Sequence, residues 1–376
     1  MAEWWTEPVT EAPILPDYAG PNVRGIIPAL LGRADWSRSL PPWFPEPVRH
    51  ARQVVVLVLD GLGWDQLSEH SADMPLLSGF TGGPITTVAP TTTATALSSI
   101  ATGLTPAEHG LVGYRMLMKG EVINVLRWLA PGGDRRRSLP PIDVQPFTPF
   151  MGITVPVVSP AELESSAFTE AHLRGSRPVG YRASSAIAVE VRHQLAAGER
   201  FVYAYYGSVD KTAHERGFGD FYDAELRAAD RLVGDIVDAL PTGAALLVTA
   251  DHGQVQVGDR IITPDPALLS SVALQSGEGR FRWWHTPGSP DTLAKEADDA
   301  YGDLAWVVTK EQMIDEGWFG PVMSPPVAAR LGDVALVAHE PVSFYEPADS
   351  GPFELICRHG SLTSAEVMVP LLAHLA

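Results

Sequence analysis

The stretch Gln53-Val-Val-Val-Leu-Val-Leu-Asp60 is an apolar run that ends in a carboxylate. Two later segments repeat this order, Phe201-Val-Tyr-Ala-Tyr-Tyr-Gly-Ser-Val-Asp210 and Ala245-Leu-Leu-Val-Thr-Ala-Asp251. Short apolar runs of this kind are typical of buried parallel strands. Open α/β sheets bind ligands at the carboxyl ends of their strands, so we expect the three carboxylates to converge there.

Helical spacing of apolar residues surrounds these runs. Residues 183–198 and 222–240 carry Ala, Val, Leu and Ile at helical intervals, and each precedes one of the strands that end in aspartate. The alternation predicts an α/β fold with a mostly parallel central sheet and helices on both faces. We expect a single catalytic domain over residues 1–376, with an N-terminal arm over 1–50 and a small cap insertion over 261–330, after which the core resumes at 333–338.

Composition excludes several classes of protein. With 45% hydrophobic and 19% charged residues the chain is an ordinary globular protein, and a formal net charge of −18 disfavours nucleic acid or an anionic membrane as a partner. The one cysteine, Cys357, precludes an intrachain disulfide. The N-terminus lacks a basic start followed by an apolar core, and no run reaches membrane-spanning length, so a cytoplasmic location is expected.

Histidines accompany the aspartates. His214 lies four residues after Asp210, His252 follows Asp251 directly, and His359 follows the late apolar stretch Phe353-Glu-Leu-Ile-Cys357. Taken singly, each aspartate would be a cap or turn residue and each histidine a core residue. Three of each in this order indicate a site for two metal ions.

A threonine-rich turn, Ala89-Pro-Thr-Thr-Thr-Ala-Thr95, precedes an Ala- and Ser-rich helix expected over residues 93–102 and ended by Gly103. A hydroxyl at this helix start lies at the positive end of the helix dipole, beside free backbone donors. Such a position suits a nucleophile that attacks phosphorus. The alternative is that these threonines only cap the helix.

Together these features resemble the alkaline phosphatase superfamily, and most closely its nucleotide pyrophosphatase/phosphodiesterase branch. In that branch the nucleophile lies in a Pro-Thr-x-Thr turn, and the following helix has the pattern S-I-x-T-G-L-x-P-x-x-H-G. This chain has Pro90-Thr-Thr-Thr93 and then Ser99-Ile-Ala-Thr-Gly-Leu-Thr-Pro-Ala-Glu-His-Gly110. The resemblance covers about residues 52 to 260 and the segment around 359, and it implies an alkaline-phosphatase-like sheet in which His109 holds the loop after the helix.

The resemblance also implies the roles of the site residues. The nucleophile would be Thr93, which forms a covalent phosphothreonine or nucleotidyl-threonine. Mixed imidazole and carboxylate ligands favour zinc, with manganese as the alternative. The substrate would be a small-molecule phosphate ester or nucleotide. One metal would be held by Asp210, His214 and His359, and the other by Asp60, Asp251 and His252, with the Thr93 oxygen adjoining it.

The chain departs from the branch at two places. Ala96 stands where the branch has asparagine, and Gly113-Tyr-Arg-Met116 stands where a second asparagine helps to bind the phosphoryl oxygen. Tyr114 or Arg115 is expected to take that role, and an arginine fork suits a doubly charged monoester. The alternative for Arg115 is a solvated surface position. The cluster Arg280-Phe-Arg-Trp-Trp-His285 could stack a nucleobase or form the core of the cap.

The leading interpretation is a metal-dependent phosphodiesterase or nucleotide pyrophosphatase. The alternatives are a phosphomonoesterase, a phosphonate hydrolase with the same metals, and a non-catalytic metal-binding pseudoenzyme. A sulfatase is disfavoured because the cysteine lies at position 357 and not at the nucleophile turn. A phosphosugar mutase is disfavoured because that group uses serine as its nucleophile.

Replacing the nucleophile tests this interpretation. We expect Thr93→Ala to keep its metals and to lose turnover, because the hydroxyl that attacks phosphorus is gone while the ligands remain. Metal content and hydrolysis of an activated ester are measured on the same preparation. A variant with a rate near that of the wild type would disprove the assignment.

Overall fold

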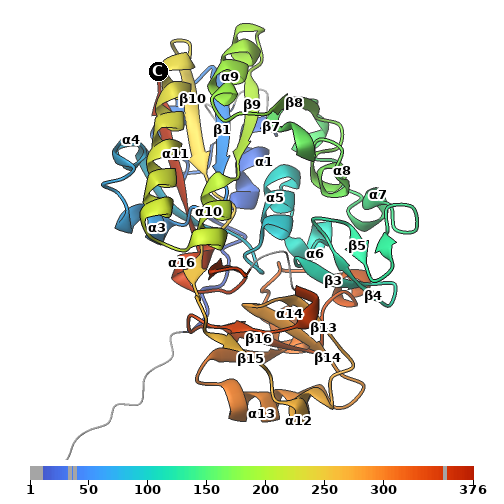
Figure 1. Cartoon of the computed structure of the whole chain (residues 1–376). Helices are drawn as coiled ribbons and strands as arrows, with labels where there is room; N and C mark the ends of the chain where they lie inside the picture. The colour runs from blue at the N-terminus through green and yellow to red at the C-terminus, as the bar shows by residue number, and fades with distance from the viewer. Residues whose placement is uncertain (1–11, 33–35, 37–39, 350–353) are drawn as a thin grey trace, which may run out of the picture.

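The computed structural model describes residues 12–32, 36, 40–349 and 354–376. A seven-stranded sheet in the order β2-β19-β10-β1-β9-β7-β8 forms its centre (Figure 1). β1 lies between β10 and β9 and is parallel to both, whereas β19 is antiparallel to its neighbours β10 and β2. The sheet is mostly parallel, as expected. Its strands are β2 (Thr81–Thr86), β19 (Met368–Leu375), β10 (Ala244–Thr249), β1 (Gln53–Leu59), β9 (Phe201–Tyr206), β7 (Pro156–Pro160) and β8 (Arg177–Tyr181).

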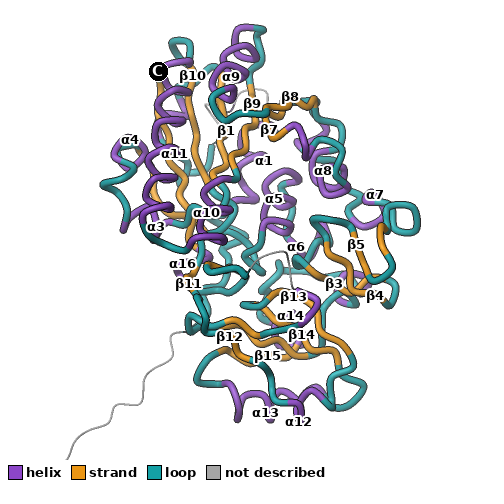
Figure 2. Tube along the Cα trace, viewed as in Figure 1, coloured by secondary structure: helices purple, strands orange, loops and turns teal. Residues whose placement is uncertain are grey.

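The central strand is buried along its length. Every residue from Val54 to Leu59 has no exposed surface, which is why the apolar run is continuous and does not alternate with polar residues. Two groups of helices flank the sheet, and within each group the helices contact one another (Figure 2). The first group is α9 (Ala186–Ala196), α10 (Ser208–Arg216) and α11 (Asp220–Ala239), and the second is α1 (Ile26–Leu31), α5 (Thr93–Thr102) and α8 (Ala167–Leu173).

The expected N-terminal arm contributes to the core itself. Its described part contains η1 (Val23–Gly25), α1 and α2 (Glu46–Arg49). Ile27 and Leu30 have no exposed surface and belong to the same apolar cluster as the central strand. Residues 1–11 lie outside the described part of the chain.

A second, antiparallel sheet of four strands lies at the bottom of Figure 1, in the order β13-β14-β16-β15. The cap insertion was expected to end at residue 330 and the core to resume at 333–338, but β16 lies inside this second sheet. Five buried apolar residues in a row suit either sheet, so periodicity could not assign them. The elements of the cap are α12 (Pro266–Leu269), β13 (Leu274–Glu278), β14 (Phe281–His285), α13 (Pro290–Tyr301), β15 (Ala305–Thr309), α14 (Lys310–Asp315) and β16 (Val334–Ala338).

Shorter elements complete the chain. A four-stranded sheet, β3 to β6, follows α5 in the chain, and β11 pairs with β18 so that the segment of His359 lies beside the loop after β10. None of the described helices is long and apolar enough to cross a membrane. The short strands are β3 (Arg115–Met118), β4 (Glu121–Asn124), β5 (Leu129–Ala130), β6 (Gly133–Asp134), β11 (Val255–Gln256), β12 (Ile261–Ile262), β17 (Ser343–Phe344) and β18 (Cys357–Arg358). The short helices are α3 (Trp64–Glu69), α4 (Pro75–Ser78), α6 (Pro106–His109), α7 (Pro141–Val144), η3 (Phe150–Gly152), η4 (Ala161–Leu163), α15 (Pro325–Ala328), η5 (Pro347–Asp349) and α16 (Ser364–Val367).

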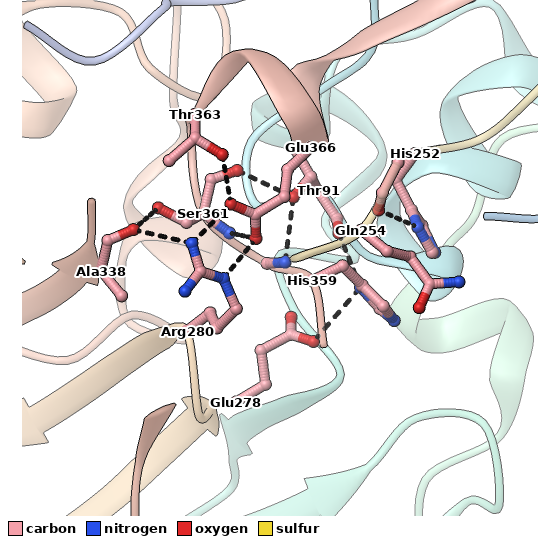
Figure 3. Close-up of polar contacts among 12 residues, drawn as sticks. Thr91, His252, Gln254, Glu278, Arg280, Ala338, His359, Ser361, Thr363 and Glu366 are labelled. Atoms are coloured by element: carbon pink, nitrogen blue, oxygen red, sulfur yellow. Dashed lines mark hydrogen bonds and ion pairs between the residues drawn. The ribbon is translucent and has the colours of Figure 1, made fainter. Parts of the chain in front are cut away.

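A buried ion pair joins the cap to the core (Figure 3). Arg280 precedes β14 of the cap and Glu366 belongs to α16, and neither side chain has exposed surface. The guanidinium donates to both carboxylate oxygens, Nε to Oε1 and Nη2 to Oε2, each at 2.8 Å. Glu366 also accepts hydrogen bonds from the Ser361 N–H at 3.0 Å and from Thr363 Oγ1 at 2.6 Å. The segment that carries His359 is therefore held between the two sheets.

Removing Glu366 should destabilise the protein strongly. We expect Glu366→Ala to lower the free energy of unfolding by about 3–5 kcal/mol, because it leaves the Arg280 guanidinium buried without its carboxylate. The matched control is Glu340→Ala, since Glu340 is half exposed and its pair with Arg260 spans 3.7 Å. The control should lose less than about 1 kcal/mol in urea unfolding. Equal losses in the two variants would mean that this pair does not hold the cap.

Candidate active site

Three neighbouring strands deliver the predicted carboxylates to one place. Asp60 follows β1, Asp251 follows β10, and Asp210 lies in the first turn of α10 after β9. The Gly61 N–H donates to Asp251 Oδ1 at 3.1 Å, and the Asp210 N–H donates to the Asp60 carbonyl at 3.0 Å. Asp60 is 3% exposed and Asp251 has no exposed surface. The expected convergence at the carboxyl ends of the strands is confirmed.

One cluster of candidate ligand atoms consists of Asp60, Asp251 and His252, which offer atoms within 4.8 Å of one another. His252 Nε2 lies 3.7 Å from Asp60 Oδ1 and 3.4 Å from Asp251 Oδ2. On the other side of the ring, His252 Nδ1 lies 3.0 Å from the Gly253 carbonyl, which can only accept. Nδ1 therefore donates to this carbonyl, which leaves Nε2 on the side of the carboxylates, where it can bind a metal ion.

A second cluster joins Asp210, His252 and His359, again with atoms within 4.8 Å. His214, the remaining predicted ligand, places its Nε2 3.2 Å from Asp210 Oδ1, and its ring centroid is 5.2 Å from that of His359. His214 Nδ1 donates to the Cys357 carbonyl at 2.6 Å, and His359 Nδ1 donates to the Thr91 carbonyl at 2.8 Å. Both rings thus turn Nε2 away from backbone acceptors, as in metal-ligating histidines.

Two orphaned oxygens show that these residues fit divalent cations. Asp60 Oδ1 and Asp251 Oδ2 are buried and have no hydrogen-bond partner. Burial raises the pKa of both carboxyls, and for Asp60 the neighbouring charge of Asp251 raises it further. Leaving such groups unpaired is costly, and a cation supplies the missing partner. The mixture of imidazole nitrogen and carboxylate oxygen suits zinc or manganese.

The three threonines of the turn, Thr91, Thr92 and Thr93, make different contacts. Thr91 ties the turn to the His359 segment, because its Oγ1 donates to the Ser361 carbonyl at 2.8 Å and accepts the Gly360 N–H at 3.0 Å. Thr92 occupies the N-cap position of α5 without a side-chain capping bond. Thr93 is the first residue of the helix, and its Oγ1 lies 3.1 Å from His252 Nε2. Of the three hydroxyls, that of Thr93 is the one beside the metal-ligand candidates.

Three further residues of the site escaped sequence reasoning. The Tyr205 hydroxyl donates to the Asp60 carboxylate, and Gln254 Nε2 donates to Asp210 Oδ1 at 3.0 Å. Glu278, at the end of β13, places Oε2 3.8 Å from His359 Nδ1, and burial raises its pKa well above the usual range (Figure 3). Tyr205 and Gln254 lie close in sequence to predicted ligands, and this closeness could have identified them. Glu278 comes from the cap, and nothing in the sequence links it to the site.

The two predicted substrate contacts differ in their surroundings. Tyr114 lines a cavity next to Thr93, and its hydroxyl accepts from Asn124 Nδ2 at 2.6 Å. Arg115 is buried and donates to Glu346 and, at 2.6 Å, to Asp349. The solvated surface position considered for Arg115 is therefore wrong. Its guanidinium is engaged by carboxylates, so a phosphate clamp at this residue gains no support.

His109 and the cluster 280–285 have structural roles. His109 accepts the Leu111 N–H at Nδ1 over 3.1 Å and bonds Ser99 Oγ through Nε2 at 2.8 Å, which confirms that it holds the loop after α5. In the cluster 280–285, Trp283 is 2% exposed and Trp284 has no exposed surface. Trp284 packs in the apolar cluster of the cap and Trp283 in the larger cluster that contains the central strand, so the idea that they stack a nucleobase is wrong.

Two cavities of about 250 Å³ each adjoin the site, and Thr93 and Asp210 line both. Tyr114 and the charged side chains of Arg127, Glu278 and Arg358 are among the residues that line the first cavity. The second cavity has the apolar side chains of Leu97, Leu163, Phe168 and Leu173 in its wall. A phosphorus atom beside Thr93 could therefore carry one substituent in each cavity.

Comparison with known proteins identifies a family and a fold for this chain. A model of the type I phosphodiesterase/nucleotide pyrophosphatase family matches residues 54–130 and 145–362. The structure is similar to human ectonucleotide pyrophosphatase/phosphodiesterase 5, with 17% identity, 86% of this chain and 87% of the other covered, and a TM-score of 0.62. The inactive threonine-to-alanine variant of the murine protein in complex with AMP gives 16% identity, 86% and 88% coverage, and 0.62.

Another solved structure with the same fold is phosphonoacetate hydrolase from Sinorhizobium meliloti 1021 in complex with phosphonoformate. Its identity is 18%, it covers 86% of this chain and 90% of the other, and its TM-score is 0.61. At these identities the likeness shows the fold alone. No curated protein sequence matches the chain.

The buried carboxyls predict an unusual pH dependence for the metal-free protein. A carboxyl whose pKa is raised by folding stabilises the folded state at low pH, and this stabilisation is lost as the pH rises above the ordinary carboxyl range. With a chelator present, the free energy of unfolding should fall as the pH rises above the ordinary carboxyl range, by up to about 1.4 kcal/mol per pH unit per group. The free energy of unfolding of Asp60→Asn should fall less over the same pH range. Parallel urea-unfolding profiles for the two proteins would contradict the assignment of this effect to Asp60.

Proposed function

Because the chain belongs to the type I phosphodiesterase/nucleotide pyrophosphatase family, we propose that it hydrolyses phosphoric diesters or pyrophosphates with Thr93 as the nucleophile. The observation that carries the proposal is the position of the Thr93 hydroxyl. It stands at the start of α5, 3.1 Å from His252 Nε2, beside two clusters of carboxylates and imidazoles. A residue that only capped the helix would not need these neighbours.

The predicted cofactor is a pair of divalent ions, zinc by ligand chemistry and manganese as the alternative. When bound, such ions lower the pKa of a nearby hydroxyl and neutralise negative charge on the phosphoryl oxygens. The residues proposed to hold one ion are Asp210, His214 and His359, and those for the other are Asp60, Asp251 and His252, with the Thr93 oxygen adjoining.

The protein orients the substrate and stabilises the negative charge on its phosphoryl oxygens. Thr92 gives α5 no side-chain cap, so the first N–H groups of this helix are available to donate to phosphoryl oxygens held beside Thr93. Thr93 Oγ1 attacks phosphorus and the bond to the leaving oxygen breaks, which gives a covalent phosphothreonine ester. Water then attacks the same phosphorus and frees Thr93. Two in-line displacements predict net retention of configuration at phosphorus.

Two features favour a diester over a monoester. Arg115 is held by Glu346 and Asp349, so it offers no free fork to a doubly charged phosphate. Two cavities adjoin Thr93, which is room for two substituents on phosphorus. A phosphomonoesterase or phosphonate hydrolase remains the alternative within the same chemistry. The pseudoenzyme alternative is disfavoured because each proposed ligand position and the nucleophile are filled.

A substrate panel tests the proposal. The measured quantity is kcat/KM for an aryl phosphodiester, the matching aryl monoester and an aryl phosphonate, with zinc-loaded protein and a chelated control. We expect the diester to be preferred over the monoester by at least about tenfold, equivalent to about 1.4 kcal/mol of transition-state stabilisation. A preference for the monoester would make the protein a phosphatase. Absence of turnover on every ester would contradict the proposed hydrolysis of phosphoric diesters.

A further inference from the structure

Arg358 is a partly buried arginine whose side chain makes no hydrogen bond or ion pair within 4.0 Å among the described residues. Arg115 is engaged by Glu346 and Asp349, Arg280 by Glu366, and Arg282 by Asp349. The Nε of Arg358 is buried without a hydrogen-bond partner, as is that of Arg282, whose Nη2 is nevertheless held by Asp349. The carboxylates whose charge acts on Arg358 are Asp349, Glu354 and Glu278.

The unpaired Nε of Arg358 is energetically unfavourable, because a buried donor that lacks an acceptor has lost its hydrogen bond to water without a replacement. A bound anion would remove the cost, and the remaining question is whether one can reach the side chain.

Arg358 is open to the first cavity beside Thr93. Its backbone is fixed in β18, where it pairs with Val255 of β11, and it directly precedes His359. Its Nη1 lies against the turn between β13 and β14, 3.5 Å from where a Cβ on Gly279 would stand. The guanidinium therefore occupies a defined place in the cavity wall, next to a proposed metal ligand.

The other charged groups of this cavity limit what it can accept. Arg127 is a second cation in the wall, and Asp349 is already engaged by Arg115 and Arg282. Besides the proposed metal ligand Asp210, the remaining carboxylate is Glu278, which forms no ion pair with Arg358 within 4.0 Å in the described part of the chain. The cavity thus offers arginine donors at one place and a separate acceptor at Glu278.

We propose that Arg358 binds a second anionic group of the substrate, distinct from the phosphorus that Thr93 attacks. The proposal rests on the proposed function and narrows its substrate class. A guanidinium fork matches the paired oxygens of a phosphate or a carboxylate. The favoured substrates are then pyrophosphate-type compounds or phosphoesters with a carboxylate in the same arm, and simple diaryl or dialkyl diesters are poor substitutes for them.

Competitive inhibition separates this role from a structural one. Zinc-loaded wild type and Arg358→Gln are assayed with a neutral-armed aryl diester at a fixed concentration of free zinc. The inhibitors are pyrophosphate against phosphate, and phosphonoformate against methylphosphonate. We expect the inhibition constants of the two-anion ligands to rise about 10- to 100-fold in the variant, while those of the one-anion ligands change less than about twofold. Loss for pyrophosphate alone identifies a phosphate as the bound group, and loss for phosphonoformate alone identifies a carboxylate.

Two further variants complete the test. Arg227→Gln is the matched control, since Arg227 is half exposed and pairs with Asp73, and it should leave all four inhibition constants unchanged. Arg358→Lys keeps the charge and loses the fork, so it should show an intermediate loss. Equal changes for one-anion and two-anion ligands, or no change, overturn the role of Arg358 while the proposed function stands. If the wild type does not hydrolyse the diester, the proposed function fails, and calorimetric binding of pyrophosphate to the same proteins still decides the role of Arg358.

Discussion

The structure depends on one constraint, which is that carboxylates are buried without cations of their own. Asp60 and Asp251 follow adjacent parallel strands of a fully buried sheet, so their side chains meet where water cannot solvate them. Each retains an oxygen with no hydrogen-bond partner. Such an arrangement destabilises the folded protein until a cation binds. The chemistry proposed for Thr93 needs the same positive charge, so the cost of folding and the proposed catalytic function have a common origin.

The surrounding residues make this arrangement specific. Backbone carbonyls accept the Nδ1 protons of His252, His214 and His359 and so set the direction of each Nε2. The buried pair of Arg280 and Glu366 joins the cap to the segment that carries His359. The cap therefore does more than cover the sheet, because it fixes one of the candidate ligands and adds Glu278 to the cavity.

Much of the fold could be predicted, because its strongest signals are local. The run at 53–59 is a strand and residues 93–102 form a helix, as periodicity and the glycine stop indicated. The strand 334–338 was assigned to the wrong sheet because a fully buried run does not say which sheet buries it. The sequence pattern also identified the six candidate ligands that lie together in the structure. It did not identify Tyr205, Gln254 and Glu278, and it left two roles open for Arg115, because these residues contact partners that are distant in sequence.

The central claim is that these carboxylates and imidazoles hold two divalent ions. Native mass spectrometry of the zinc-reconstituted protein measures this directly through the number of ions per chain. The account predicts two ions for the wild type and one each for Asp60→Asn and Asp210→Asn, since each substitution removes a ligand from a different cluster. A wild type that binds one ion or none, or variants that both keep two, would contradict it.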